Sequence, residues 1–215
     1  MSDQQTEVEP LRLTVDELDV LLALAETPGS AISAEKLQLG EELTGLSNRH
    51  GISSLAARNL VTISGEDIET GTETTLIARN LENSIHWIEL AFISAVATEG
   101  ALIITAPRSR IFYGAREAGT FDVTALHPDS PVSEAVTALA DAFFALGSPA
   151  AVGLTVTGAL GERFFAIRAN ADESWEIATG PADPETGLSP KTDVTRAEAY
   201  AQLADFLGAD SVGAE

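Results

Sequence analysis

Apolar residues in the first third of the chain recur at helical intervals. The segment LTVDELDVLLALAE places its leucines on one helical face, and Thr14 and Glu17 have the spacing of a capping box at its start. A second helix is predicted over 33–45, with Ser33 as its N-cap, and a third over 52–58. A glycine turn between two short extended pieces, in NLVTISGEDI, then predicts a hairpin.

The segment over 72–126 changes from the helical period of apolar residues to short strands. Apolar positions between 72 and 100 step by three or four residues, which predicts one long helix with a buried stripe. Short strands follow in ALIITA (101–106), SRIFYGA (109–115) and TFDVTAL (120–126). Their connections are too short for parallel crossovers, so we expect antiparallel pairing.

The same order of elements then returns. A helix between Ser130, its predicted N-cap, and Gly147 precedes strands in AAVGLTVTG, RFFAIRA and SWEIAT. The last helix, in TRAEAYAQLADFLG, begins with a capping box of Thr195 and Glu198. We therefore expect an α+β fold: an N-terminal helical, winged-helix-like unit, then an antiparallel sheet flanked by helices, with helix plus three strands occurring twice.

These elements predict one α+β domain over 11–208. It divides into a helical, winged-helix-like subdomain over 11–70 and a sheet subdomain over 72–208. Residues 1–10 are expected to be a disordered acidic tail, and 209–215 a flexible one.

Composition and charge narrow the classes of function. The chain has 33 acidic and 12 basic residues, a net charge of −21, which repels polyanions such as nucleic acid. Its 45% hydrophobic content supports a folded core. The absence of cysteine excludes disulfides, thiol nucleophiles and cysteine zinc sites. With a polar N-terminus and no apolar run of about 20 residues, we expect a cytoplasmic protein without membrane insertion.

The third helix and its hairpin resemble a recognition helix and wing. DNA recognition needs several Lys or Arg on both. This helix offers Arg58, preceded by Arg49 and His50, and the wing is acidic. The sequence therefore predicts the shape of a winged helix without nucleic acid as a partner.

Catalytic and metal-binding patterns are missing. His50, His86 and His127 are far apart and lack HxxxH or HExxH spacing, and no GxSxG elbow occurs. GAREAGT (114–120) has the glycine spacing of a phosphate loop but no lysine, and it joins two strands, so a hairpin turn is expected. We predict no enzyme, no catalytic residues, no metal and no cofactor.

Three arginines form the strongest local positive patch. Arg108 and Arg110 share one face if both lie on a strand, and Arg116 is expected nearby. The patch fits a contact for an acidic partner or anion. It equally fits a solvated edge strand, where charges block aggregation.

Four segments together resemble a known family. LTVDELDVLLALAE, LAARNLV before a glycine turn, ALIITAPRSRIFYGAREAGTFDVTAL and VSEAVTALADAFFAL are similar to EspG-type chaperones of actinobacterial type VII (ESX) secretion, over about 11–207. The family pattern L-A-x-R-G-L-V has glycine where this chain has Asn59. Sparse lysine with abundant alanine and glycine is compatible with an actinobacterial source.

The resemblance implies a non-enzymatic cytosolic chaperone. Such a protein covers the exposed hydrophobic tip of a helical secreted protein or protein pair. The sheet strands and the long loop over 180–193 are the expected contact regions. The candidate partner-binding residues are Arg108, Arg110, Phe112, Arg116, Phe164 and Arg168.

Two other classes stay open from the sequence. A regulatory protein would combine a degenerate winged helix with an α+β domain that senses a small ligand. A positive strip from Arg49, His50, Arg58 and Arg79 would favour it. An enzyme would need a pocket where two carboxylates, or a carboxylate and a histidine, converge.

Overall fold

The computed structural model places most of the chain. It describes residues 10–24, 27–39, 45–65, 67–117, 119–127, 129–180 and 190–208. Apart from Pro10, the two predicted tails lie outside these residues, and so does most of the predicted long loop.

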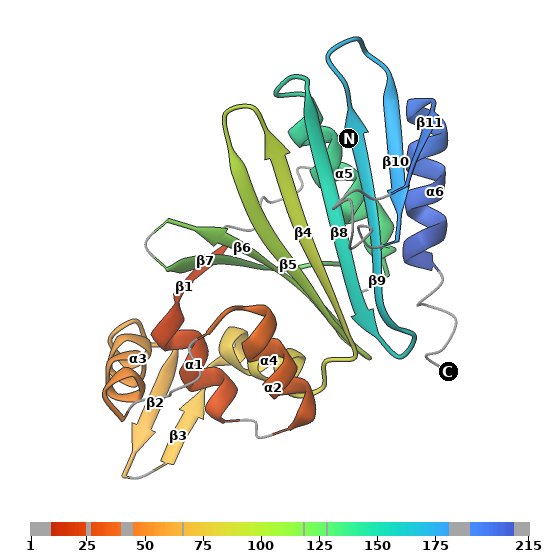
Figure 1. Cartoon of the computed structure of the whole chain (residues 1–215). Coiled ribbons are helices and arrows are strands. Elements are labelled where there is room, and N and C mark those ends of the chain that lie inside the picture. Colours follow the sequence, from red (N-terminus) through yellow and green to blue (C-terminus); the bar gives the residue numbers. More distant parts are fainter. Residues whose placement is uncertain are drawn as a thin grey trace, which may run out of the picture.

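Nine strands form one antiparallel sheet within the described residues (Figure 1). Their order across the sheet is β1-β7-β6-β5-β4-β8-β9-β10-β11. The strands are β1 Leu11–Thr14, β4 His86–Ser94, β5 Thr98–Ala106, β6 Ser109–Arg116, β7 Thr120–Ala125, β8 Ala150–Gly158, β9 Gly161–Ala169, β10 Trp175–Thr179 and β11 Lys191–Val194. A separate hairpin pairs β2 Val61–Ser64 with β3 Asp67–Thr70, as the turn glycine predicted.

The described helices gather in two groups. The helices are α1 Val15–Ala23, α2 Pro28–Lys36, α3 Gly45–Ala57, α4 Thr72–Glu82, α5 Val132–Phe144 and α6 Arg196–Gly208. The first four lie with the small hairpin at one end of the molecule, and α5 and α6 lie against the other half of the sheet (Figure 1). The expected fold class, α+β with an antiparallel sheet flanked by helices, is confirmed.

The repeat is a helix followed by four strands, one more than the sequence predicts. One half contains α4 and β4–β7, and the other contains α5 and β8–β11. The first strands of the two halves, β4 and β8, pair at the centre, and each half continues outward in chain order. This order is what a two-fold relation between the halves produces.

The predicted long helix over 72–100 is wrong. Helix α4 ends at Glu82, and β4 begins at His86. Because β4 is a central strand, it buries Trp87 on one face and Ile88 on the other. Apolar residues on both faces of a buried strand imitate the spacing of a helix stripe, so periodicity alone does not separate the two.

The second helix begins earlier than predicted. Thr27 caps α2 together with Ser30, and Pro28 occupies the first turn. Ser33, the predicted N-cap, is buried inside the helix, where its Oγ accepts a hydrogen bond from Trp87 Nε1 at 2.8 Å. Gly45, the predicted stop, instead begins α3.

Local signals at other helix ends are confirmed or nearly so. The backbone N–H of Glu17 donates to Thr14 Oγ1 at 3.2 Å, and the Thr14 N–H donates to Glu17 Oε2 at 2.9 Å. The box of Thr195 and Glu198 forms in the same way. Helix α5 starts at Val132, one residue later than expected, with Pro131 rather than Ser130 as its N-cap.

Asn59 follows α3 with a φ of +57°. This left-handed conformation favours glycine and tolerates asparagine better than most other residues. The structure thus gives a physical reason for the glycine of the EspG-type pattern at this position.

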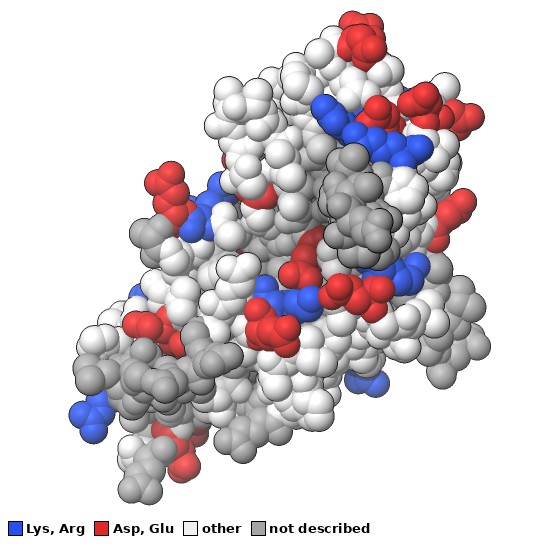
Figure 2. Space-filling view, viewed as in Figure 1, with Lys and Arg blue, Asp and Glu red and all other residues white. Residues whose placement is uncertain are grey.

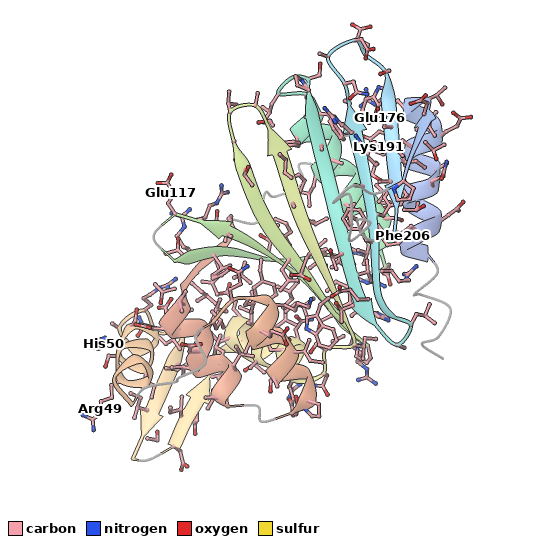
Figure 3. All side chains as sticks on the ribbon, viewed as in Figure 1. Arg49, His50, Glu117, Glu176, Lys191 and Phe206 are labelled. Atoms are coloured by element: carbon pink, nitrogen blue, oxygen red, sulfur yellow. The ribbon has the colours of Figure 1, made fainter. Side chains whose placement is uncertain are left out.

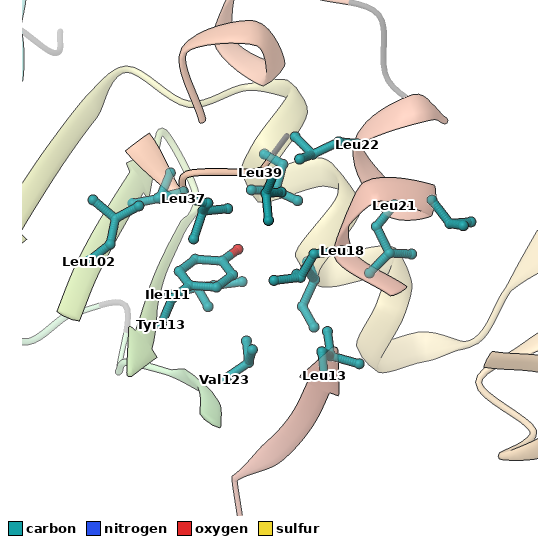
Figure 4. Close-up of a cluster of buried hydrophobic side chains, with 14 of the residues drawn as sticks. Leu13, Leu18, Leu21, Leu22, Leu37, Leu39, Leu102, Ile111, Tyr113 and Val123 are labelled. Carbon is teal, nitrogen blue, oxygen red and sulfur yellow. The ribbon is translucent and has the colours of Figure 1, made fainter. Parts of the chain in front are cut away.

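Two hydrophobic cores lie on opposite faces of the sheet. Leu102 and Ile104 of β5 pack with α1–α4, whereas Ile103, between them, packs with α5 and α6. In the first core, Tyr113 is surrounded by leucines from the strands and the N-terminal helices (Figure 4). Each helical group therefore covers a different face, over a different half of the sheet.

A buried ion pair joins the parts of the N-terminal unit. Glu17 of α1 is fully buried, and its Oε2 accepts from Arg58 Nη1 at 2.8 Å. Ser54 of α3 donates to Glu17 Oε1 at 2.7 Å, and Arg58 Nη2 donates to the Arg12 carbonyl at 2.7 Å. One carboxylate thus ties α1, α3 and β1 together.

The variant Arg58→Met is expected to lower the free energy of unfolding by about 2 kcal/mol, because it leaves the Glu17 carboxylate buried without a counter-charge. Chemical denaturation measures the loss. Adding Glu17→Gln should recover part of it. Arg79→Met, at an exposed position on α4, should stay within about 0.5 kcal/mol of the wild type. Equal stabilities for Arg58→Met and Arg79→Met would contradict the assigned role.

Candidate functional site

Among the residues that the structure describes, no helix covers one side of the second half of the sheet. Along β8 and β9 the side chains facing α5 and α6 are buried, and most of those between them are half-exposed. In the described part of the chain, no helix packs over this other side of β8, β9 and β10 (Figure 1). We call this side, with the adjoining side chains of β4 and β5, the open face.

Small residues cross the open face in one row. The pairing registers align one glycine or alanine from each of five neighbouring strands: Gly100, Ala91, Gly153, Ala166 and Ala178. Since neighbouring strands lie about 4.8 Å apart, the row is about 19 Å long. With so little side chain above the backbone, a partner can approach the sheet closely along this row.

A hollow of about 520 Å³ opens where the row meets the N-terminal unit. Gly100, Ala91 and Gly153 contribute to its lining from the strands, and Phe164 of β9 stands at its side. The end of α2 contributes Lys36, Leu37 and Gln38. The lining is mainly apolar, so the hollow suits an apolar side chain better than a polar ligand.

Charged side chains cluster beside this hollow. Lys36 Nζ lies 2.6 Å from Glu89 Oε2 and 3.5 Å from Glu162 Oε2, which links α2 to β4 and β9. Burial lowers the pKa of Lys36, but its hydrogen bonds and attraction to both carboxylates outweigh burial and raise that pKa. Figure 2 shows charged groups along this boundary and an almost uncharged surface over β4, β5 and β8.

The structure brings two of the predicted contact residues to the open face. Phe164 and Arg168 lie on it, four residues apart along β9. Arg110 and Phe112 of β6 lie on the other side of the sheet, and Arg108 lies in the turn before β6. The three arginines therefore do not share one strand face, because Arg108 is outside the strand.

The two other arginines of the predicted patch have partners. Arg110 Nη1 donates to the carbonyl of Ser130 at 2.8 Å. Arg116 Nε donates to Asp122 Oδ2 at 2.7 Å, and Arg12 Nε donates to Asp122 Oδ1 at 2.8 Å. These hydrogen bonds from the two guanidinium groups lower the pKa of Asp122.

The positive strip that would favour a regulatory protein is interrupted. Arg58 lies within it but is bonded to the buried Glu17. Arg49 and His50 lie on α3, at the outer edge of the N-terminal unit (Figure 3). Exposed acidic residues of the wing, such as Asp67, follow in the chain. The geometry gives no continuous basic surface along the winged-helix-like unit as described.

Other predicted chemistry falls in ordinary structural positions. Gly119 has a φ of +66° in the β6–β7 turn, as expected for a hairpin glycine. His127 Nδ1 accepts a hydrogen bond from the Asp129 N–H at 3.3 Å. Within the described ranges, no three His, Asp or Glu side chains gather as metal ligands. None of the described helices is long and apolar enough to cross a membrane.

Sequence reasoning missed the row and the hollow. Ala91 of the row lies in a strand that the sequence analysis predicted as helix. Lys36, at the hollow, has ion-pair partners that are far away in the chain. The alternation VGLTVTG in β8 did indicate a strand with one covered and one exposed face, since it puts small or polar residues between buried ones.

Comparison with known proteins gives matches among solved structures. No protein-family model and no curated protein match the sequence. One of these structures is a type VII secretion system chaperone, and the likeness to it is one of fold. The chain is similar to Mycobacterium tuberculosis EspG5, solved in complex with a PE25-PPE41 dimer, with a TM-score of 0.53 and 8% identity over 94% of this chain and 95% of that one. Such low identity shows a shared fold and no more.

We expect Asp122→Asn to cost about 1 kcal/mol of stability at pH 7, because it removes a carboxylate bonded to two arginines. Since the folded pKa of Asp122 is depressed, its contribution is present above the unfolded pKa of about 3.9 and is lost as the pH falls through the lower folded pKa. Denaturation of both proteins between pH 7 and pH 2 measures the difference. A second check is the carboxyl resonance of Asp122, whose titration Arg116→Gln should shift to higher pH. An unchanged midpoint would contradict the role of Arg116.

Proposed function

We propose that this protein is a non-enzymatic binding protein that covers an apolar surface on a helical secreted partner, in the manner of a type VII secretion chaperone. The open face is the observation that carries the proposal. A partner held before export requires a binding protein in the cytoplasm, which agrees with the location expected from the sequence. The EspG5 neighbour, which was solved with a PE25-PPE41 dimer, supports a helical protein pair as the partner class.

The open face has the surface chemistry that such a partner needs. Its centre is a row of glycine and alanine, with Phe164 beside it. At the end of β4, Ile93 is 48% exposed, and Val96 in the following turn is 94% exposed. Burying these apolar groups under a partner gains free energy in proportion to the apolar area covered. The exposed apolar groups thus extend from the hollow to the β4–β5 turn.

The polar groups of the open face support binding rather than catalysis. Glu89 and Glu162 converge, but Lys36 lies between them and bonds to both. Farther along the sheet, Glu176 lies 3.4 Å from Lys191 (Figure 3). Paired charges of this kind hold a surface in place and orient a partner. Phe164 and Arg168 remain our proposed contacts from the sequence, because they share this face.

The proposal is tested with the helical secreted pairs of the organism that makes this protein. Each pair is co-expressed with it, and complexes are detected by size-exclusion chromatography with light scattering. We expect one pair to form a stoichiometric complex that survives moderate salt, since the contact is mainly apolar. If no pair forms a complex, the proposal is wrong.

The variant Ala166→Arg should weaken that complex by about tenfold or more, because it puts a long charged side chain into the row where the partner lies closest. Ala201→Arg makes the same change at an exposed position on α6 and should bind like the wild type. Calorimetric titration gives both dissociation constants. Equal binding by the two variants would place the contact elsewhere.

A further inference from the structure

We infer that the open face selects a partner tip in which an apolar side chain stands next to a lysine or arginine. This inference rests on the proposed function and adds the chemistry of the contact. The apolar side chain enters the hollow, and the neighbouring cation meets Glu162.

The geometry of the hollow separates an apolar part from a charged part. Gly100, Ala91 and Gly153 line it from the strands, and Phe164 gives it an apolar side. The charged residues of the lining are Lys36 and Glu89 at the border with α2, and Glu99 near the start of β5. A partner side chain in the hollow therefore lies within a few ångströms of these charges. The partner residue beside that side chain must have a charge complementary to them.

The charges at this border do not cancel. One ammonium group, Lys36, contacts two carboxylates, Glu89 and Glu162, which leaves one net negative charge at neutral pH. The two carboxylates are not equivalent. Glu89 is bonded to Lys36 at 2.6 Å and is 37% exposed, whereas Glu162 is 3.5 Å away and 65% exposed. Glu162 is therefore the carboxylate with room for a second cation.

The rest of the molecule acts in the same direction. With a net charge of −21, the chain attracts a positively charged tip from a distance and repels a negatively charged one. Over β4, β5 and β8 the surface is nearly uncharged (Figure 2). Charged groups of a partner therefore interact with opposite charges mainly at the border with α2. The buried apolar area gives the binding affinity, and the charges at this border determine which partner is preferred.

Three small probes of equal chain length test the preference directly. Hexylammonium, hexanol and hexanoate are titrated into the full-length protein labelled with nitrogen-15, at low ionic strength, where the screening length is about 30 Å at 0.01 M. The amide signals of Gly100 and Gly153 report entry into the hollow. We expect hexylammonium to bind about three- to tenfold more tightly than hexanoate, because a unit charge several ångströms away contributes about 1 kcal/mol when water screens it, as it does at the exposed Glu162.

Substitutions at the two carboxylates should then change the preference in steps. Glu162→Gln neutralises the border, so the preference for hexylammonium over hexanoate should fall to the smaller value that the remaining acidic surface gives. Glu89→Gln with Glu162→Gln leaves Lys36 without a carboxylate partner at this border, so the preference should move further towards hexanoate. Glu134→Gln, at an exposed position on α5, removes the same charge elsewhere and should keep the wild-type preference. Unchanged binding of hexanol in every variant shows that the hollow is intact.

The inference is overturned if the wild type binds hexanoate as tightly as hexylammonium, or if none of the probes shifts Gly100 and Gly153. Those results leave the proposed function standing, because a helical pair can still bind the open face through apolar contacts alone. Conversely, a preference for hexylammonium together with the absence of any complex with helical pairs would overturn the proposed function and keep the charge preference of the hollow.

Discussion

The whole structure depends on how two small helical groups share one large sheet. A sheet has two faces, and each must be covered or left in contact with water. Here α1–α4 cover one face over β5–β7, and α5 and α6 cover the opposite face over β8–β10. The central strand β4 belongs to both cores, through Trp87 on one side and Ile88 on the other. This diagonal arrangement leaves the open face without a helix over it in the described part of the chain.

The open face therefore results from where the helices pack on the sheet and does not depend on an unusual residue. Helices α5 and α6 bury one face of β8 and β9. Residues on the opposite, open face, such as Ala151 and Ala166, can therefore be small without weakening that core. The end of α2 limits the open face on one side, where Lys36 ties it to the sheet. Fold and candidate site thus follow from the same division of the sheet.

Several basic residues serve structure within this acidic chain. Arg58 neutralises Glu17, Arg12 and Arg116 hold Asp122, and Lys36 lies between two glutamates. Among α5, α6 and β10, Arg196 bonds to Asp141 and lies over the ring of Trp175. Since the chain has 33 acidic and 12 basic residues, its surface keeps a large excess of carboxylates after these pairs form, which opposes polyanions and favours cationic surfaces.

The sequence by itself determined the α+β class, most of the strands and the ends of several helices, because capping boxes such as Thr14 with Glu17 and turn residues such as Gly119 act within a few positions. It misassigned 86–94 as helix, since a strand buried on both faces has no period of two. Phe164 and Arg168, which the structure places on one face of β9, stay predicted contacts. Only the tertiary structure decided which sheet face is open and placed Lys36 beside Glu162, since strand order and long-range registers bring these positions together and leave no local pattern in the chain.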